Sequence, residues 1–279
     1  MLFVLHLFEM SIIDWLIDKT NQFIKNNECN SYAIKITIPI DTNITRFKPA
    51  HPQESLITPL TVLDDMKRLA LYHPHLVTKR NAPQLHRIAH YLYTHLEMPL
   101  ENIQIIFCEN RGVDIGGFLL ALDQIVKQQQ PHDFLVKFHS KGHESRTWYT
   151  LFLDLKVNKI LNYYNCIYAS NLQIPDHCTN MRYMRKLQRM TGLAHIPTFP
   201  FAVGTMFIVS SQFTQFVADW SFIHYFNMLN RGHNYTYEPY FERLFGCIFE
   251  HLNLKRYYFA HFPMTSTIHE HFLSSPYII

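Results

Sequence analysis

Residues 103–126 read IQIIFCENRGVDIGGFLLALDQIV, and this stretch decides the fold class. Its first five residues are mostly apolar and rich in isoleucine, which is typical of a short buried strand. Over residues 116–130 apolar side chains recur at helical spacing, which predicts a helix. A buried strand that leads through a short glycine-rich turn into a helix is the repeating unit of α/β proteins.

The same alternation of short strand-like runs and longer helical runs continues on both sides of this stretch. It predicts an α/β fold with a mostly parallel sheet flanked by helices. Residues 41–59 carry three prolines and no periodicity, which is typical of a surface loop. The aromatic tail around Tyr257 has no pattern that favours a helix or a strand. The other expected strands cover residues 2–7, 33–38, 134–138, 167–169 and 203–209, and the other expected helices cover 11–24, 60–71, 82–96, 148–164, 179–190 and 238–251.

Length and composition indicate one large folded domain over residues 1–279. The chain is 48% hydrophobic and 17% charged, which excludes a disordered protein because it provides ample apolar surface for a core. Its length fits a single core and excludes an array of domains. The net charge of +3 is too small to indicate a nucleic-acid partner.

Cysteine usage and hydropathy predict a cytoplasmic protein. The five cysteines are widely spaced and include no C-x-x-C pair, as expected for reduced, mostly buried thiols. No apolar run reaches the roughly 18 residues of a membrane-spanning helix. The apolar opening, residues 2–7, is interpreted as a strand because it lacks the basic leader and cleavage site of a signal peptide.

The turn before the helix at 116–130 is the first candidate binding site. In open α/β sheets ligands bind beyond the carboxyl ends of the strands, and a helix N-terminus favours phosphate. Gly112, Gly116 and Gly117 would let the backbone approach a ligand. Asn110 and Asp114 would hydrogen-bond a ribose, base or sugar hydroxyl. The alternative interpretation is structural: Asp114 caps the helix and the glycines form a tight turn.

A second candidate lies one crossover later, at Lys137, His139 and Lys141. Alternation along a strand puts these three side chains on one side of the sheet. A right-handed crossover would bring their strand end beside Asp114. Two lysines and a histidine beside a turn that favours phosphate predict an anion site. A polar strand end with solvated lysines is the alternative interpretation.

The pattern of candidate metal ligands is incomplete. His86 and His90 have the i, i+4 spacing of zinc ligands on a helix, but no H-E-x-x-H motif or nearby cysteine completes a tetrahedral set. The chain has no Asp-x-Asp, and the pair Asp64 and Asp65 is interpreted as the start of a helix. The sequence therefore predicts no metal site.

The expected helix over 179–190 carries a basic face. Arg182, Arg185, Lys186 and Arg189 recur at helical spacing, opposite apolar residues such as Leu187. A solvated basic face is one interpretation. Contact with a membrane surface or an anionic acceptor is the other.

Two carboxylates lie at the start of the expected helix over 238–251. Glu238 suits the first turn and the helix dipole, with Pro239 at the first helical position. Glu242 lies one turn later among aromatic residues, where partial burial would raise its pKa and make it a base. A structural pair of Glu242 with Arg243 is equally open.

Four motifs occur in order along the chain, after an opening LHLF at residues 5–8. They are NRGVDIGGFL at 110–119, KFHSK at 137–141, FAVGTMF at 201–207 and FERLF at 241–245. In this order and spacing they resemble the rhamnan synthesis protein F family, over roughly residues 1 to 255. Those proteins are glycosyltransferases, or proteins similar to them, of polysaccharide biosynthesis. The resemblance implies a GT-A fold, a Rossmann-like mixed sheet that binds a nucleotide-diphosphate sugar.

The resemblance also implies where the donor would bind, in a half formed by residues 1–145. His139 and Lys141 occupy the strand end where many GT-A enzymes carry Asp-x-Asp and a metal ion. This basic pair would instead neutralise the diphosphate directly. The implied donor-binding residues are His6, Asn110, Arg111, Gly112, Asp114, Gly116, His139 and Lys141.

Residues 146–279 would form the acceptor half and the C-terminal tail. Gly204 and Thr205 would lie on a strand beneath the acceptor, with Arg243 on the same side. Glu242 would match the late acidic position that is the base in inverting members, and Asp114 is the second candidate catalytic residue. The chain departs from the family at Gly117, where proline is frequent, and after Phe207, where an aromatic residue is frequent, so donor preference is not carried across.

The resemblance thus implies an inverting glycosyltransferase, with dTDP-rhamnose or a UDP-sugar as expected donor and a glycan or glycolipid as acceptor. Glu242 would deprotonate the acceptor hydroxyl, while His139 and Lys141 stabilise the departing nucleoside diphosphate. No cofactor is required in this scheme, although Mn²⁺ or Mg²⁺ is compatible with it. Two alternatives stay open: a catalytically silent nucleotide- or glycan-binding module on the same fold, and a histidine-rich metal-dependent hydrolase.

Overall fold

The computed structural model describes residues 1–28, 31–40, 47, 69–140, 146–173, 181–193, 199–231 and 237–262. The loop predicted over 41–59 lies outside these residues, apart from residue 47. Asp64, Asp65 and Lys141 also lie outside them.

The described residues form an α/β fold built on one mixed sheet of eight strands in the order β3-β4-β2-β1-β5-β7-β6-β8. The five strands from β3 to β5 are mutually parallel. Strand β7 is antiparallel to both of its neighbours, and β8 is parallel to β6. The predicted class, a mostly parallel sheet flanked by helices, is therefore confirmed. The strands are β1 (Leu2–His6), β2 (Ala33–Pro39), β3 (Leu69–Leu71), β4 (Ile103–Cys108), β5 (Phe134–His139), β6 (Cys166–Gln173), β7 (Phe199–Ser210) and β8 (Arg256–Phe262).

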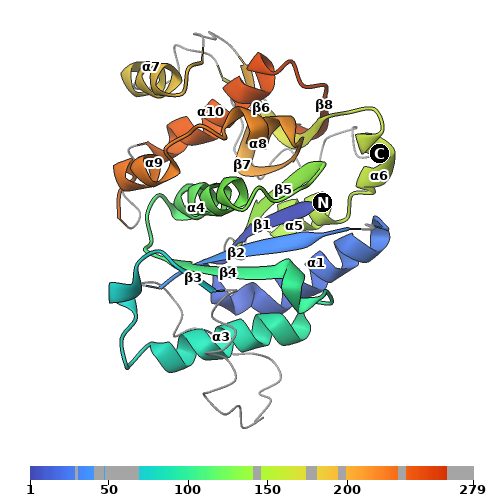
Figure 1. The fold of residues 1–279 in the computed structure, drawn as a ribbon. Helices are drawn as coiled ribbons and strands as arrows, with labels where there is room; N and C mark the ends of the chain where they lie inside the picture. The colour runs from blue at the N-terminus through green and yellow to red at the C-terminus, as the bar shows by residue number, and fades with distance from the viewer. Residues whose placement is uncertain are drawn as a thin grey trace.

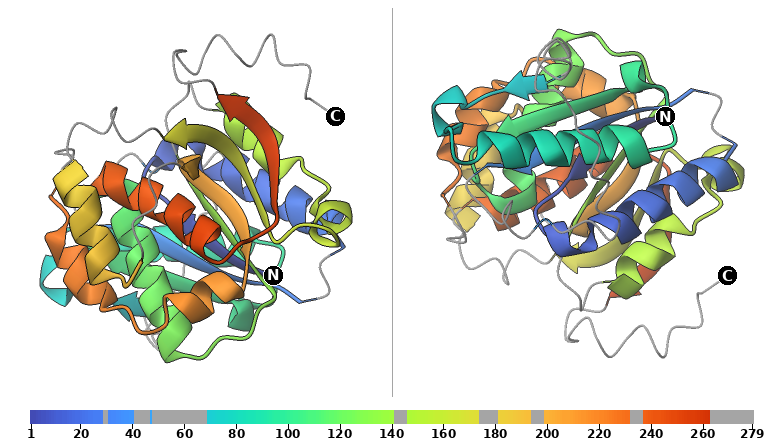
Figure 2. Two further views of the ribbon diagram at one scale, coloured as in Figure 1. Left: turned by 90° about the horizontal axis from the view of Figure 1, so that it is seen from above. Right: turned by 90° about the horizontal axis from the view of Figure 1, so that it is seen from below.

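Helices cover both faces of this sheet. Helices α1 and α3 lie on one face, while α4 and α10 lie on the other (Figures 1 and 2). Among the described residues, no helix combines the length and apolar character needed to cross a membrane. The helices are α1 (Ile13–Asn26), α3 (Ala82–His95), α4 (Val113–Lys127), α5 (Arg146–Leu153), α6 (Val157–Leu161), α7 (Met181–Met190), α8 (Gln212–Phe216), α9 (Phe222–Met228) and α10 (Glu238–His251), with short 3-10 turns at Met10–Ile12, Pro74–Leu76 and Leu100–Asn102.

Ten of the 15 residues of helix α4 are buried, because the helix packs between the sheet and two other helices. It contacts β1 and β2 on one side and α9 and α10 on the other. Phe118 lies on the sheet side and packs edge-to-face against Phe207 of β7 and Phe245 of α10, with ring centroids 5.7 and 5.4 Å apart. Such pairs add about 0.5–1.5 kcal/mol each beyond the area they bury. The N-terminus of α4 is thereby held firmly against the sheet.

The connections create a switch point between β1 and β5. From β1 the chain crosses to β2 on one side, whereas from β4 it passes through α4 to β5 on the other side of β1. The two strands end together, with His6 paired to His139. In open α/β sheets the crevice outside such a switch point is the usual place for a ligand.

Two predicted helices differ from the structure. Residues 69–71 were expected at the end of a helix, but Leu69–Leu71 forms strand β3 at the edge of the sheet. The single helix predicted over 148–164 is divided into α5 and α6. Between them the Asn27 side chain donates to the Leu155 carbonyl and accepts from Val157 N–H, so a tertiary contact takes the backbone groups that a continuous helix would use.

The tail around Tyr257, which carried no prediction, forms strand β8 and extends the sheet beyond β6. The short helices α8 and α9 were also not predicted. All of these elements are short or lie at the edge of the sheet, where local patterns are weakest and tertiary neighbours decide the conformation.

Candidate functional site

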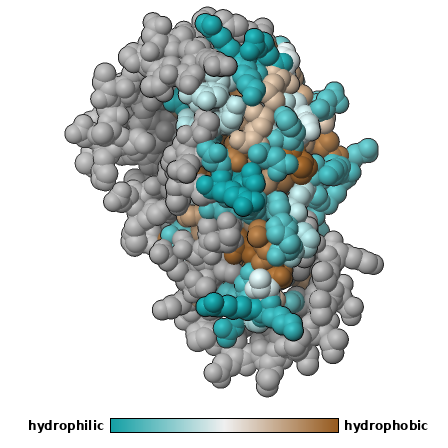
Figure 3. All heavy atoms as spheres, turned by 90° about the vertical axis from the view of Figure 1, so that its left-hand side faces the viewer, coloured by the Kyte–Doolittle hydropathy of each residue, from teal (hydrophilic) through white to brown (hydrophobic). Residues whose placement is uncertain are grey.

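A pocket of about 310 Å³ lies at the switch point, beyond the ends of β1 and β5. Figure 3 shows the side of the molecule on which the parallel strands end, where hydrophobic residues lie among hydrophilic ones. The pocket is formed by the segment after β1 (Phe8, Glu9), the first turn of α4 (Gly112, Val113, Asp114, Ile115), the end of β5 (His139, Ser140), the middle of β7 (Gly204, Thr205) and the start of α10 (Glu238, Pro239, Glu242).

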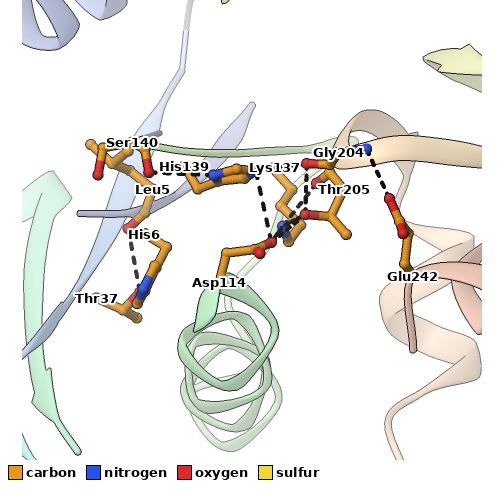
Figure 4. Close-up of polar contacts among 10 residues, drawn as sticks. All are labelled: Leu5, His6, Thr37, Asp114, Lys137, His139, Ser140, Gly204, Thr205 and Glu242. Carbon is orange, nitrogen blue, oxygen red and sulfur yellow. Dashed lines mark hydrogen bonds and ion pairs between the residues drawn. The ribbon is translucent and has the colours of Figure 1, made fainter. Parts of the chain in front are cut away.

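A buried ion pair forms the floor of the pocket. Lys137 Nζ donates to Asp114 Oδ2 at 2.7 Å, and to the carbonyl and hydroxyl oxygens of Thr205 at 2.8 Å each (Figure 4). Lys137 is 1% exposed, and its ammonium also lies 5.2 Å from the centre of the Phe118 ring. These contacts match the three donors of a lysine. Lys137 therefore holds α4, β5 and β7 together rather than facing a ligand.

Asp114 remains ionised because of this arrangement. Burial by itself raises the pKa of the Asp114 carboxyl, but the charges of Lys137 and His139 and the hydrogen bonds from Lys137 and Thr205 lower it further. The net result is a pKa well below the usual range for an aspartate. Asp114 thus offers the pocket a permanent hydrogen-bond acceptor and is a poor base at neutral pH.

Two β-branched residues beside Asp114 have left-handed backbone conformations. Val113 has φ of +52° and Thr205 has φ of +55°. Positive φ is a true outlier for β-branched residues and costs about 1–3 kcal/mol each. Both residues line the pocket. Strain of this kind persists only where surrounding contacts hold it, and it gathers at functional sites.

Strand β7 bulges where it passes the pocket. Tyr168 of β6 pairs with Phe207, but Ser170, two residues further on, pairs with Ala202, so β7 carries extra residues in between. Gly204 and Thr205 lie in this irregular stretch. A bulge re-aims the residues that it contains. Here it directs Gly204 and Thr205 toward Asp114 and His139.

His139 lies on the opposite wall from α10. Its Nε2 is 2.6 Å from the Gly204 carbonyl oxygen and 3.9 Å from Asp114 Oδ2. Because a carbonyl only accepts, the first contact assigns a proton to Nε2. His139 is 4% exposed, so its ring is fixed in place.

Ser140 organises the segment that follows β1. Its Oγ accepts hydrogen bonds from the backbone N–H groups of Phe8 and Glu9, both at 2.7 Å, and its own N–H donates to the His6 carbonyl at 2.8 Å. The sequence interpretation missed Phe8, Glu9 and Ser140, and also Ile115, Glu238 and Pro239, whereas Val113 lies within the stretch 110–114 that it assigned to the donor site. Their signal was position: three of them directly follow strands at a switch point.

His6 lies beneath the pocket and does not line it. The ring is 2% exposed, and Nδ1 is 2.8 Å from Thr37 Oγ1. Burial, together with the positive charge of Lys137 and the nearby His139, lowers the pKa of His6 to about 3 against the opposing effect of Asp114. His6 is therefore neutral. A Cβ at Gly117 would lie 2.2 Å from His6 Nδ1, so glycine at this position makes room for the ring.

The other glycines of the turn allow close packing within the chain. A Cβ at Gly116 would lie 1.9 Å from the Arg111 carbonyl oxygen, and one at Gly112 would lie 2.5 Å from a Leu229 methyl group. Gly112 has φ of +61° and lines the pocket, whereas Gly116 does not. The tight-turn interpretation therefore accounts for Gly116 in this structure.

Asn110 and Arg111, two predicted donor-binding residues, lie outside the pocket lining. Arg111 Nε donates to Glu109 at 2.8 Å, and Nη1 donates to the Leu229 carbonyl at 3.2 Å. Its guanidinium is 5.9 Å from the centre of the Phe226 ring. Arg111 therefore ties the turn to α9. Asn110 is buried, with 4% exposed.

Helix α10 supplies the acidic wall. Glu242 Oε1 accepts from Gly204 N–H at 2.8 Å, and its Oε2 lies 3.7 Å from Arg243 Nη1. Arg243 does not line the pocket; it donates to the Pro239 carbonyl at 2.6 Å. Glu238 is buried in the first turn, as predicted, and accepts from Asn230 N–H at 3.2 Å.

The charges around the pocket differ from the prediction. Four carboxylates line it, from Glu9, Asp114, Glu238 and Glu242. Of the predicted basic pair, His139 is present and Lys141 lies outside the described residues. Lys137 compensates Asp114 from below. The described walls are thus rich in hydrogen-bond acceptors.

Within the described ranges, no three or more histidine, cysteine, aspartate or glutamate side chains are grouped so that they could hold a metal ion. His86 and His90 lie on α3, on the other face of the sheet (Figure 1).

The chain matches none of the protein-family models, and no curated protein matches it significantly. The resemblance to the rhamnan synthesis protein F family therefore stays a prediction.

The ion pair makes a prediction about stability. Lys137→Met should lower the free energy of unfolding by about 3–5 kcal/mol, because it leaves a buried carboxylate without its partner. Adding Asp114→Asn should restore part of the loss. Urea unfolding of the wild type, both single variants and the double variant measures the coupling. Additive losses would show that the two side chains do not stabilise each other.

The same pair predicts a pH dependence. The pKa of Asp114 in the folded state lies below its ordinary value of 3.8, so the pair stabilises the fold above that pH and loses its effect as the pH falls further. The difference in unfolding free energy between wild type and the Lys137→Met/Asp114→Asn variant should be constant near neutrality and change only below about pH 4. A change already near pH 6 would contradict the assignment.

Proposed function

We propose that this chain is a glycosyltransferase of GT-A fold that transfers a sugar from a nucleotide-diphosphate sugar to a glycan or glycolipid acceptor. One observation carries the proposal. The pocket at the switch point joins the first turn of α4 on one side to an acidic wall from α10 on the other. It therefore offers one end suited to phosphate and one suited to hydroxyl groups.

The α4 side suits the diphosphate of the donor. The positive end of the helix dipole faces the pocket through residues 112–115. Asp114 is compensated by Lys137, so its charge opposes an anionic ligand less than an unpaired carboxylate would. His139 adds a ring beside the same turn, and Lys141 follows it in the sequence.

The acidic wall suits a sugar. Carboxylates accept hydrogen bonds from hydroxyl groups, and Glu238 and Glu242 line the pocket from α10, with Glu9 on the segment after β1. The volume of about 310 Å³ lies within the range of small-molecule sites, roughly 300–1,000 Å³.

In the proposed step Glu242 accepts the proton of an acceptor hydroxyl, and the hydroxyl oxygen attacks the anomeric carbon of the donor. The bond from that carbon to the diphosphate breaks, and the electron pair leaves with the nucleoside diphosphate. One displacement inverts the anomeric configuration. Asp114, whose pKa is strongly lowered, is assigned to orient a sugar hydroxyl and not to remove a proton.

No step of this scheme passes through a metal ion. Asp114 Oδ2, the natural candidate ligand, already accepts from Lys137 and from Thr205. We therefore assign Asp114 Oδ2 to these protein contacts and not to a divalent cation.

A silent binding module on the same fold is the second candidate. It is favoured by the fact that Asp114 and Glu242 both make contacts within the protein, to Lys137 and to Gly204 N–H. Asp114, whose pKa is strongly lowered, is a poor base. The two candidates differ in turnover and not in nucleotide binding.

Glu242→Gln should preserve donor binding and lower sugar transfer about 100-fold or more, because the amide cannot accept the proton. Product formation is measured by chromatography, and donor binding by calorimetry. Glu101→Gln, at an exposed glutamate outside the pocket, is the matched control and should behave as wild type. Wild-type turnover in the Glu242→Gln variant would remove Glu242 from the mechanism.

Nucleotide binding is tested by thermal unfolding with UDP, dTDP, GDP, CMP and their sugar conjugates, each with EDTA or Mn²⁺. A ligand at about 100 times its dissociation constant adds about 2.7 kcal/mol, which shifts the midpoint by several degrees in a chain of this size. A selective shift that survives EDTA is expected. No shift with any nucleotide would refute the donor site, and a shift without transfer to any acceptor would favour the silent module.

A further inference from the structure

The basic face of α7 is not used by the proposed reaction. Residues 181–190 include Arg182, Arg185, Lys186 and Arg189 and no acidic residue. Arg185, Lys186 and Arg189 are exposed, while Met184 and Leu187 are buried. The helix thus turns its apolar side into the protein and presents cations outward. Among the described residues, no ion pair with a carboxylate involves Arg185, Lys186 or Arg189.

Helix α7 is fixed beside the pocket through α10. Tyr183 packs against Tyr237 and Tyr240, with ring centroids 5.0 and 5.6 Å apart. Lys186 Nζ donates to Tyr237 Oη at 3.2 Å. The next residue after Tyr237 is Glu238, which lines the pocket. The basic face and the pocket therefore share one support, the start of α10.

Both features also lie toward the same side of the molecule. Figure 1 places α7 at the upper left, on the side where the parallel strands end. In Figure 3, which faces that side, hydrophilic residues occupy the top of the view. A flat surface in contact with α7 would therefore lie on the same side of the molecule as the pocket.

We propose that the basic face of α7, defined by Arg185, Lys186 and Arg189, binds a membrane surface that contains anionic lipids. These three cations span about one turn, or about 6 Å along the helix axis, without a counter-charge on the helix. Each lysine or arginine close to an anionic leaflet strengthens binding to it. The apolar side is already buried, so the helix adsorbs to the surface and does not insert.

This surface binding does not depend on the proposed transfer reaction. Only its consequence does: if the acceptor is a glycolipid, α7 would hold the pocket near the acceptor. A soluble polyanion such as a nucleic acid is disfavoured because the whole chain carries a net charge of only +3.

The test is co-sedimentation of the full chain with vesicles of phosphatidylcholine alone, and with vesicles of equal parts phosphatidylcholine and phosphatidylglycerol. We expect binding only to the anionic vesicles, falling as the ionic strength rises. Arg185→Glu/Lys186→Glu/Arg189→Glu should weaken this binding by at least about tenfold. A second variant with glutamine at the same three positions should lose most of it without reversing charge.

The matched control is Lys79→Glu/Arg80→Glu/Arg87→Glu, which reverses three exposed cations at and beside α3, on the other face of the sheet. It changes the net charge by the same amount and should retain vesicle binding. Equal losses in the α7 and control variants would overturn the proposal, as would absence of wild-type binding to anionic vesicles. Equally tight binding to duplex DNA at the same phosphate concentration would also overturn it.

Discussion

The buried ammonium of Lys137 is the contact on which the site depends. It joins Asp114 at the start of α4 to the kinked part of β7 at Thr205, and it does so from β5, the strand next to the switch point. A buried charge is tolerated only when it is paired and hydrogen-bonded. Lys137 meets that condition with the groups that shape the pocket floor. The position of α4 relative to β7 therefore depends on the charge of the Lys137 side chain. The Phe118 ring contacts the Lys137 ammonium on its apolar side.

Strain and close packing surround this pair. Val113 and Thr205 adopt left-handed conformations that β-branched residues rarely take, one on each side of Asp114. Gly116 and Gly117 have no room for a Cβ, because the Arg111 carbonyl and the His6 ring occupy the space. Natural proteins usually violate local preferences only where function requires it. Two of the five described non-glycine residues with positive φ line this one pocket, which supports a functional role for it apart from any resemblance.

The character of the pocket follows from which charges are compensated. The charge of Lys137 is compensated by Asp114 at the floor of the pocket. The acidic groups from α10 and from the segment after β1 therefore dominate the described walls. That balance suits hydroxyl-rich ligands, with the α4 dipole as the feature that favours phosphate. Among the described residues, exposed cations lie away from the pocket lining, notably on α7, which contacts Tyr237. The pocket, which is lined by hydrogen-bond acceptors, is thus separate from the basic face of α7. Helix α10 contacts both.

The sequence by itself determined the α/β class, most of the strands and helices, and the meeting of Asp114 with the end of β5, because periodicity and right-handed crossovers are local or topological rules. It also placed His139, Gly204, Thr205 and Glu242, which line the pocket. Only the tertiary structure decided that Lys137 is buried and joins α4, β5 and β7, and that Leu69–Leu71 is a strand. It also decided which predicted site residues lie outside the pocket lining, namely His6, Asn110, Arg111, Gly116 and Arg243. Those outcomes depend on burial and on contacts between residues far apart in the chain, such as Lys137 with Thr205, which no local pattern encodes.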